Sequence, residues 1–170
     1  NPVIVDNRPE PGGNIYAYLG RNARNPEQMK VFGRDYAKGA KLVTSFTEAV
    51  SAGRVTYHGS TRVWRLEPDG TFAFDGRCGA RTGTAKKVLL ATGAQERPMP
   101  LPGWTLPGVM GVGAAQILMK SGGVLPAGDI AIVGAGPLPL LLTEQLGAAG
   151  RPATAIIEPA GASSLLRAAP

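Results

Sequence analysis

The apolar positions change their spacing along the chain, and each spacing predicts a different kind of element. Residues 14–53 show the spacing of an amphipathic helix that packs on a sheet, and Gly53 is a natural C-terminal cap. The apolar helical positions are Tyr36, Ala40, Val43, Phe46 and Val50. In residues 54–85 the period falls to two, which predicts an antiparallel β-meander. A short strand is expected near residues 55–57, and further strands near residues 62–67 and 71–75, with a third at residues 80–85.

The next stretch predicts a buried strand, a linker and a helix. Residues 88–91 form an apolar run that breaks at Gly93, where the backbone can approach another group closely. Three prolines in residues 98–102 exclude regular structure and indicate a domain boundary. Residues 111–123 predict a helix that ends at a pair of glycines, and its Met and Leu stripe is interpreted as core.

Residues 129–158 contain a strand, a glycine turn, a helix, a second strand and an acid, in the order of a dinucleotide-binding βαβ unit. Gly134 allows a sharp turn out of the strand, and Gly136 lets the backbone approach a pyrophosphate. The helix from Pro137 would direct free N–H groups and its positive dipole end at the phosphates. Glu158 stands where its carboxylate would accept a hydrogen bond from a ribose 2′-OH.

Proline occupies position 139, where this pattern has its third glycine. Glycine at this position allows close packing of the helix on the strand, and a proline adds bulk at that contact. A plain βαβ unit that binds no nucleotide therefore stays an alternative. If a dinucleotide binds, the Glu158 carboxylate would repel a 2′-phosphate, which favours NAD over NADP. Arg167 is the one nearby basic residue that would offset this repulsion.

The first residues of the chain repeat, on a smaller scale, the strand followed by an acid that ends at Glu158. Val3, Ile4 and Val5 form a short apolar strand, and Asp6 follows it before a Pro/Gly-rich turn. By analogy with Glu158, Asp6 is a candidate ribose-binding acid, and a loop cap is the alternative. The chain lacks an initiator Met and stops shortly after Glu158, so we expect it to be a piece of a longer protein.

Composition excludes several functional classes. The net charge is +6, but the basic residues are scattered and aromatics make up 6%, so no nucleic-acid site is predicted. Cys78 is the only cysteine, which excludes an internal disulfide, a thiolate metal site and a CxxC pair, and favours a reducing, cytoplasmic location. No transmembrane segment or signal is predicted. His58, the only histidine, is interpreted as a loop residue without a function.

Three motifs together resemble two-domain FAD/NAD(P)-dependent oxidoreductases. They are Asp6 with PGGNIY, the run LLATGAQERPMPLPGWTLPGV, and the IAIVGAGP loop. More closely, the chain resembles the FAD-containing subunits of opine oxidase, dye-linked proline dehydrogenase and hydrogen cyanide synthase, over nearly its whole length. Thioredoxin-reductase-like members carry a CxxC between the linker and the second loop, and this chain has none, which excludes dithiol chemistry.

The resemblance implies a role for individual residues. Asp6 would hold the FAD adenosine ribose, and Pro11, Gly12 and Gly13 would lie near the flavin nucleotide. Ala91, Thr92 and Gly93 would pack against it. Gly134, Gly136 and Glu158 would form a second site, for NAD or an adenine nucleotide. No catalytic acid or base and no metal ligand is identified.

The expected fold is α/β, with two incomplete Rossmann-like halves and the meander, about residues 54–85, inserted in the first. Residues 1–102 would be a partial FAD-binding domain and residues 103–170 a partial NAD(P)-binding-type βαβ domain. The family's first strand, beside the strand that carries Asp6, is missing. We therefore expect either disorder in residues 1–30 or coverage of the gap by another chain.

The expected function is part of a FAD-dependent enzyme that oxidises a small amine or amino acid by hydride transfer. The piece by itself is expected to be inactive, with substrate contacts in missing segments or in other subunits. The alternative is a non-catalytic nucleotide-binding subunit of a heteromeric dehydrogenase.

Overall fold

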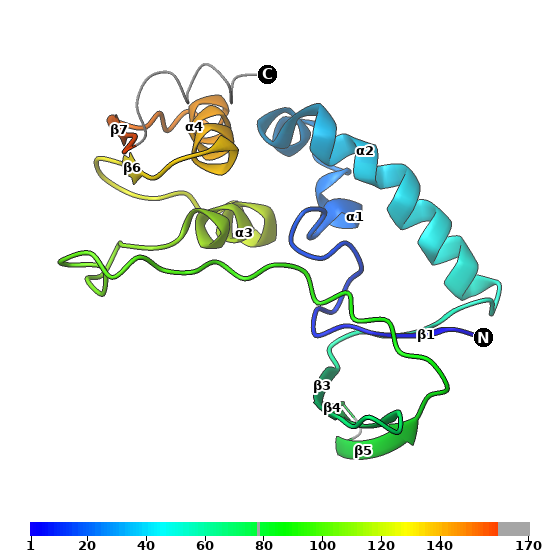
Figure 1. Cartoon of the computed structure of the whole chain (residues 1–170). Helices are drawn as coiled ribbons and strands as arrows, with labels where there is room; N and C mark the ends of the chain where they lie inside the picture. The colour runs from blue at the N-terminus through cyan, green and yellow to red at the C-terminus, as the bar shows by residue number, and fades with distance from the viewer. Residues whose placement is uncertain (78, 160–170) are drawn as a thin grey trace. The chain divides into compact units, whose positions relative to one another are not determined.

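The computed structural model describes residues 1–77 and 79–159, which fall into two compact units. The first unit consists of Asn1–Tyr18 and Lys38–Ala94, and the second of Leu19–Ala37 and the chain from Gln95 onward. Figure 1 labels most of the helices and strands of both units. Helices and strands are mixed in each of them, as the sequence predicts for an α/β protein.

The first unit begins with a parallel pair of short strands. Strand β1 (Val3–Val5) lies beside β2 (Thr56–His58), with Ile4 opposite Tyr57. β1 has no other strand partner in the described chain, and Val3 and Ile4 stay 56% and 39% exposed. Among the described strands β1 is thus an edge strand. The structure describes residues 1–30 throughout, and the expectation of disorder there or of coverage by another chain stays a prediction.

The predicted meander is a three-stranded antiparallel sheet in the order β3–β4–β5 (Figure 1). The strands are β3 (Arg62–Leu66), β4 (Thr71–Gly76) and β5 (Gly79–Thr84). A register shift lies between Val63 and Arg65. In the turn before β4, Asp69 Oδ1 accepts a hydrogen bond from the Thr71 N–H at 2.8 Å. The period-two pattern and its turn were therefore sufficient to predict this sheet.

Residues 14–53 are mostly helical, as predicted, but they form two helices and leave residues 14–18 and 23–25 outside them. A short α1 (Leu19–Asn22) precedes α2 (Pro26–Ser51), and α2 contains a kink at Gly33, where φ is 78° and ψ is −179°. Helix α2 ends as expected, because Gly53 has a φ of 67° and the Arg54 N–H donates to the Ala49 carbonyl at 2.9 Å. The kink lies in the part of α2 that belongs to the second unit.

The second unit contains the predicted βαβ segment together with helix α3 (Val112–Gly122). Strand β6 (Ala131–Val133) leads into α4 (Pro137–Ala148), and β7 (Ala155–Ile157) returns parallel to β6. Helices α3 and α4 are joined by a buried hydrogen bond of 2.9 Å from Gln116 Nε2 to Gln145 Oε1. Its apolar core consists of Leu19, Phe32, Tyr36, Ala115, Met119, Ile132, Leu142 and Leu146. Met119 belongs to this core, as the stripe predicted, but Leu118 of the same stripe is 41% exposed, so that part of the prediction is wrong.

The prediction of a buried strand over residues 88–91 is wrong. These residues form no strand, and all are exposed, with Leu89 at 89% and Leu90 at 70%. A strand requires a neighbour to accept and donate its backbone hydrogen bonds, and the described chain offers none beside this segment. An apolar run alone therefore does not specify a strand here.

Candidate functional site

The glycine turn between β6 and α4 has the backbone conformation that the sequence predicted. Gly136 has a φ of 95° and a ψ of −172°, a combination that is essentially restricted to glycine, and Gly134 has a φ of 153°. Pro137 is the first residue of α4, where its missing N–H costs nothing. The turn therefore delivers the chain into α4 without a side chain at Gly136.

The parallel register brings Glu158 to the same edge of the β6–β7 pair as this turn. Val133 and Ile157, the last residues of the two strands, are opposite each other, and the Gly134 N–H donates to the Ile157 carbonyl at 3.0 Å. Glu158 follows directly and is half-buried. A carboxylate thus lies one strand away from the glycine turn at the start of α4. Dinucleotide-binding βαβ units have this arrangement, with the carboxylate at the ribose and the turn at the pyrophosphate.

The N-terminus of α4 differs from those of α2 and α3. Asn25 Oδ1 caps α2 by accepting from the N–H groups of Glu27 and Gln28, at 3.1 and 3.3 Å. Glu96 accepts from the first turn of α3. No side chain caps α4, where the cap position is Gly136. Its first-turn N–H groups and positive dipole end therefore suit an anionic ligand.

Pro139 fits where the dinucleotide-binding pattern has its third glycine. It is buried in the first turn of α4, and a Cβ on Gly134 would lie 3.4 Å from the Pro139 Cγ, an ordinary contact. The Thr143 hydroxyl donates to the Pro139 carbonyl at 2.9 Å. The added bulk is therefore accommodated by the glycine turn itself, and the helix begins normally.

In the first unit, Asp6 ends β1 and is held by several hydrogen bonds. Its backbone N–H donates to the His58 carbonyl, and its carbonyl accepts from the Thr61 N–H, both at 2.9 Å. Oδ1 accepts from the Arg8 N–H at 2.9 Å, so the side chain does act as a loop cap. The other carboxylate oxygen, Oδ2, accepts a long 3.4 Å bond from the Tyr57 hydroxyl. Capping and ligand binding are thus compatible, because they use different oxygens.

Tyr57 is the residue beside Asp6 that sequence reasoning missed. Its ring packs edge-on against Phe46, with centroids 5.3 Å apart. Burial of the phenol, together with the negative charge of Asp6, raises the pKa of Tyr57 to about 12. The hydroxyl therefore stays protonated and remains a hydrogen-bond donor toward the carboxylate. The separation of 51 residues explains why no local pattern pointed to this pair.

The remaining predicted residues of the first unit have different surroundings. Gly12 has a φ of 125°, and a Cβ there would lie 2.6 Å from the Tyr16 carbonyl oxygen, so the turn itself requires this glycine. Gly13 also has a positive φ, and Pro11 precedes them in the same turn. Ala91, Thr92 and Gly93 are exposed and lie in no helix or strand. No hydrogen bond among the described residues joins the 91–93 segment to Asp6.

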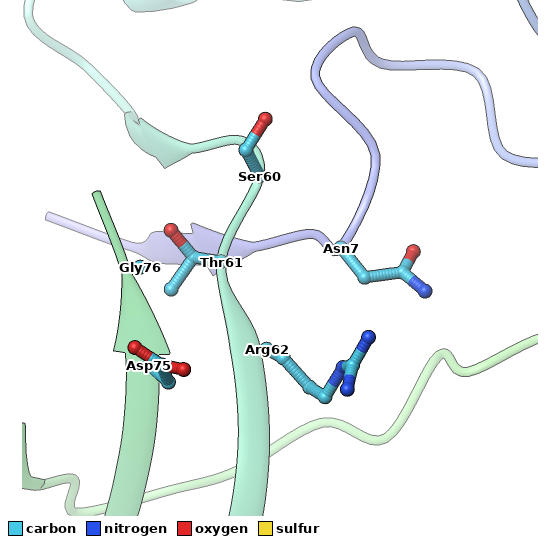
Figure 2. Close-up of a pocket in the computed structure, with 6 residues that line it drawn as sticks. All are labelled: Asn7, Ser60, Thr61, Arg62, Asp75 and Gly76. Carbon is cyan, nitrogen blue, oxygen red and sulfur yellow. The ribbon is translucent and has the colours of Figure 1, made fainter. Parts of the chain in front are cut away.

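A polar hollow of about 320 Å³ lies next to the Asp6 loop (Figure 2). It is lined by Asn7, Ser60, Thr61, Arg62, Asp75 and Gly76. Figure 2 shows the Asn7 and Arg62 side chains extending on the same side of the β3 strand, with Asp75 on the neighbouring strand β4. Arg62 and Asp75 are opposite each other in the register. Sequence reasoning missed this hollow, because alternation predicts which face a residue occupies but not which strand ends meet.

The described residues contain neither a metal centre nor a spanning helix. No group of three or more His, Cys, Asp or Glu residues is close enough there to hold a metal ion. None of the helices in the described ranges is long and apolar enough to cross a membrane. Arg167, the predicted counter-charge near Glu158, lies outside the described residues.

The amino-acid sequence is similar to subunits of several oxidising enzymes. It is 43% identical over 166 residues to an opine oxidase subunit from Agrobacterium tumefaciens (strain Ach5), an alignment that covers 93% of this chain and 32% of the relative. It is 35% identical over 158 residues to hydrogen cyanide synthase subunit HcnB of Pseudomonas aeruginosa, with coverage of 87% and 31%. The chain thus spans about a third of the length of these relatives. No family model matches it.

Two solved structures share its fold. The L-proline dehydrogenase from P. horikoshii superposes with a TM-score of 0.62 and 16% identity, covering 92% of this chain and 30% of that one. A NAD-dependent persulfide reductase from A. fulgidus gives a TM-score of 0.60 at 16% identity. At this identity the likeness demonstrates the mixed α/β fold alone.

Proposed function

Because the chain is homologous to subunits of opine oxidase and hydrogen cyanide synthase, we propose that it is part of a FAD-dependent oxidoreductase that acts on a small amine or amino acid. Bound FAD would accept the hydride, and the protein would bind and orient the cofactor. The names of the relatives describe subunits, which supports further subunits as partners. No side chain of the described residues is assigned as a catalytic acid or base.

The observation that carries this proposal is the geometry of the two strand ends. In each unit a parallel strand ends in an acid, Asp6 after β1 and Glu158 after β7. In the second unit a glycine turn and an uncapped helix N-terminus lie at the same edge. Both features serve the binding of an adenosine and a pyrophosphate. We propose residues 1–102 and 103–170 as the corresponding FAD-binding and NAD(P)-type halves.

In the FAD half we propose that Asp6 Oδ2 accepts from a ribose hydroxyl. This oxygen is available because the stronger hydrogen bond, from the Arg8 N–H, uses Oδ1. The polar hollow beside Thr61 would take polar atoms of the same nucleotide. We propose that Pro11, Gly12 and Gly13, and the exposed 91–93 segment, lie against the cofactor in the complete protein.

In the second half we propose that Gly134, Gly136 and Glu158 bind a dinucleotide of the NAD type. A 2′-phosphate would meet the Glu158 carboxylate, so NADH should bind at least about tenfold more tightly than NADPH, roughly 1.4 kcal/mol. Replacing Glu158 with Ala should remove most of this preference. Titration calorimetry of the full-length protein with both coenzymes measures it. Equal affinities in the unmodified protein would contradict the assignment of Glu158 to the ribose.

The flavin assignment has its own test. The full-length protein, purified without added cofactor, should show the visible absorbance of a bound flavin, and a small amine or amino-acid substrate should bleach it. Asp6→Ala should lower the fraction of protein that retains FAD, whereas Glu144→Ala, a change on α4 of the other unit, should not. A full-length protein without flavin absorbance, which also fails to bind added FAD, would refute the proposal.

A second function, a non-catalytic nucleotide-binding subunit of a heteromeric dehydrogenase, is favoured by one observation. Pro139 stands where the dinucleotide-binding pattern has its third glycine, so the unit departs from that pattern at the helix–strand contact. In this case the second site would bind ATP tightly and NADH oxidation would not occur. Bleaching of the flavin by NADH would rule this alternative out.

A further inference from the structure

Helix α3 is capped by a side chain that lies far upstream in the sequence. Glu96 Oε1 accepts a hydrogen bond from the Gly113 N–H at 2.8 Å, and Oε2 accepts from the Ala114 N–H at 3.3 Å. The residue at the cap position is Gly111, which has no side chain to perform this role. A carboxylate at this end of a helix is stabilised by both the free N–H groups and the dipole.

The two glycines at the start of α3 leave the space that this carboxylate occupies. A Cβ on Gly111 would lie 2.7 Å from Glu96 Cδ, and one on Gly113 would lie 3.1 Å from Oε2. Gly111 has a φ of −67° and a ψ of 153°, which any residue adopts. Backbone conformation therefore does not require glycine at position 111. A methyl group there would instead displace the Glu96 carboxylate, the end of an exposed and flexible side chain, from the place where it caps α3.

We propose that Glu96 is a positioning residue that fastens the chain following the 91–93 segment to the first turn of α3, with Gly111 and Gly113 keeping the space for it. Gly93 precedes Glu96 by only three residues in the sequence. The chain is therefore held at Glu96, three residues after Gly93, by the contact with α3. The consequence for FAD rests on the proposed function, whereas the contact itself does not.

A double-mutant cycle on the full-length protein tests the contact. The variants are Glu96→Ala, Gly111→Ala and the double replacement, and the measurement is hydrogen–deuterium exchange in peptides covering α3. In the presence of Glu96, the added methyl displaces the carboxylate, so Gly111→Ala should accelerate exchange. After Glu96→Ala the same replacement should have little effect, giving a coupling of about threefold or more. Gly147→Ala, at an open position on α4, is the control for adding a methyl group.

Conservative variants separate the capping contact from the charge alone. Gln at position 96 keeps one acceptor oxygen and should restore part of the protection of α3, because its NH₂ group cannot accept the second N–H. Asp keeps the charge but is one methylene shorter, so it should behave like Ala. Full protection in Glu96→Asp would overturn the proposed reach of the side chain. Additive effects in the cycle would overturn the contact.

Retention of FAD tests the positioning role. After gel filtration, Glu96→Ala should retain at least about threefold less FAD than the unmodified protein, Glu96→Gln should be intermediate, and the control Glu144→Ala should match the unmodified protein. If Glu96→Ala retains as much FAD as the unmodified protein although the double-mutant cycle shows coupling, the positioning role is overturned and Glu96 is a helix cap only. A full-length protein without FAD would refute the proposed function, while the contact would still be decided by the cycle.

Discussion

Replacing Gly136 with Ala should destabilise the start of α4, and the size of the effect follows from the backbone alone. At a φ of 95° and a ψ of −172°, a side chain costs about 1–3 kcal/mol. A Cβ at this position meets nothing within 4 Å, so no steric clash adds to this cost. Gly147 provides the matched control, because it lies within α4, its Cβ would also meet nothing, and its φ is not positive.

Gly147→Ala should stabilise α4 by about 0.5–1 kcal/mol, the ordinary gain for Ala over Gly within a helix. The two replacements add the same methyl group to the same helix, yet they should change stability in opposite directions. Hydrogen–deuterium exchange of peptides covering Pro137–Ala148 in the full-length protein measures local opening. Gly136→Ala should accelerate this exchange by about fivefold to 150-fold, and Gly147→Ala should slow it by about twofold to fivefold.

Unchanged or slower exchange in Gly136→Ala would refute the argument, because it would mean that the positive φ is not maintained in the protein. Equal acceleration by both replacements would also refute it, since a general sensitivity of α4 to added bulk would then explain the result. If Gly136 also approaches a pyrophosphate, its replacement should weaken dinucleotide binding, whereas Gly147→Ala should leave the affinity unchanged.

Three further predictions concern the described core and two titrating groups. Tyr57→Phe removes the donor to Asp6, so it should weaken FAD binding. In the unmodified protein the raised pKa of Tyr57 keeps the phenol neutral in the folded state, so stability should be lost only as the pH rises from 10 toward 12. Ultraviolet difference titration of the protein against the variant follows this ionisation. Hydrogen bonds from the backbone N–H and then the hydroxyl of Thr71 lower the pKa of Asp69 below its usual value of 3.8. The β3–β4 turn should therefore lose stability as the pH falls below about 4. Hydrogen–deuterium exchange of this turn should show the pH dependence in the unmodified protein and lack it in Asp69→Asn. Leu146→Ala should destabilise the second unit by about 2–5 kcal/mol in urea unfolding, since Leu146 is fully buried, and a cost below about 1 kcal/mol would contradict its place in the core.

The sequence by itself determined the elements that are specified by residues close together in the chain. The glycine turn, Pro137 and the return to a second strand predicted the β6–α4–β7 unit, because backbone conformation and apolar spacing are properties of neighbouring residues. The same holds for the meander, where the Asp69 turn and the period of two specify a hairpin. The position of Glu158 also followed from the sequence, since parallel strands in one βαβ unit end at a common edge.

Only the tertiary structure decided which distant groups meet. Residues 88–91 have the apolar pattern of a strand, yet they remain exposed, because strand formation depends on a hydrogen-bonding neighbour and not on composition. Tyr57 meets Asp6 across 51 residues, and Glu96 meets Gly113 across 17. Gly111 could be recognised in the sequence as a glycine but not explained. The neighbour of Gly111 is a carboxylate from elsewhere in the chain, and that contact exists only once the chain has folded.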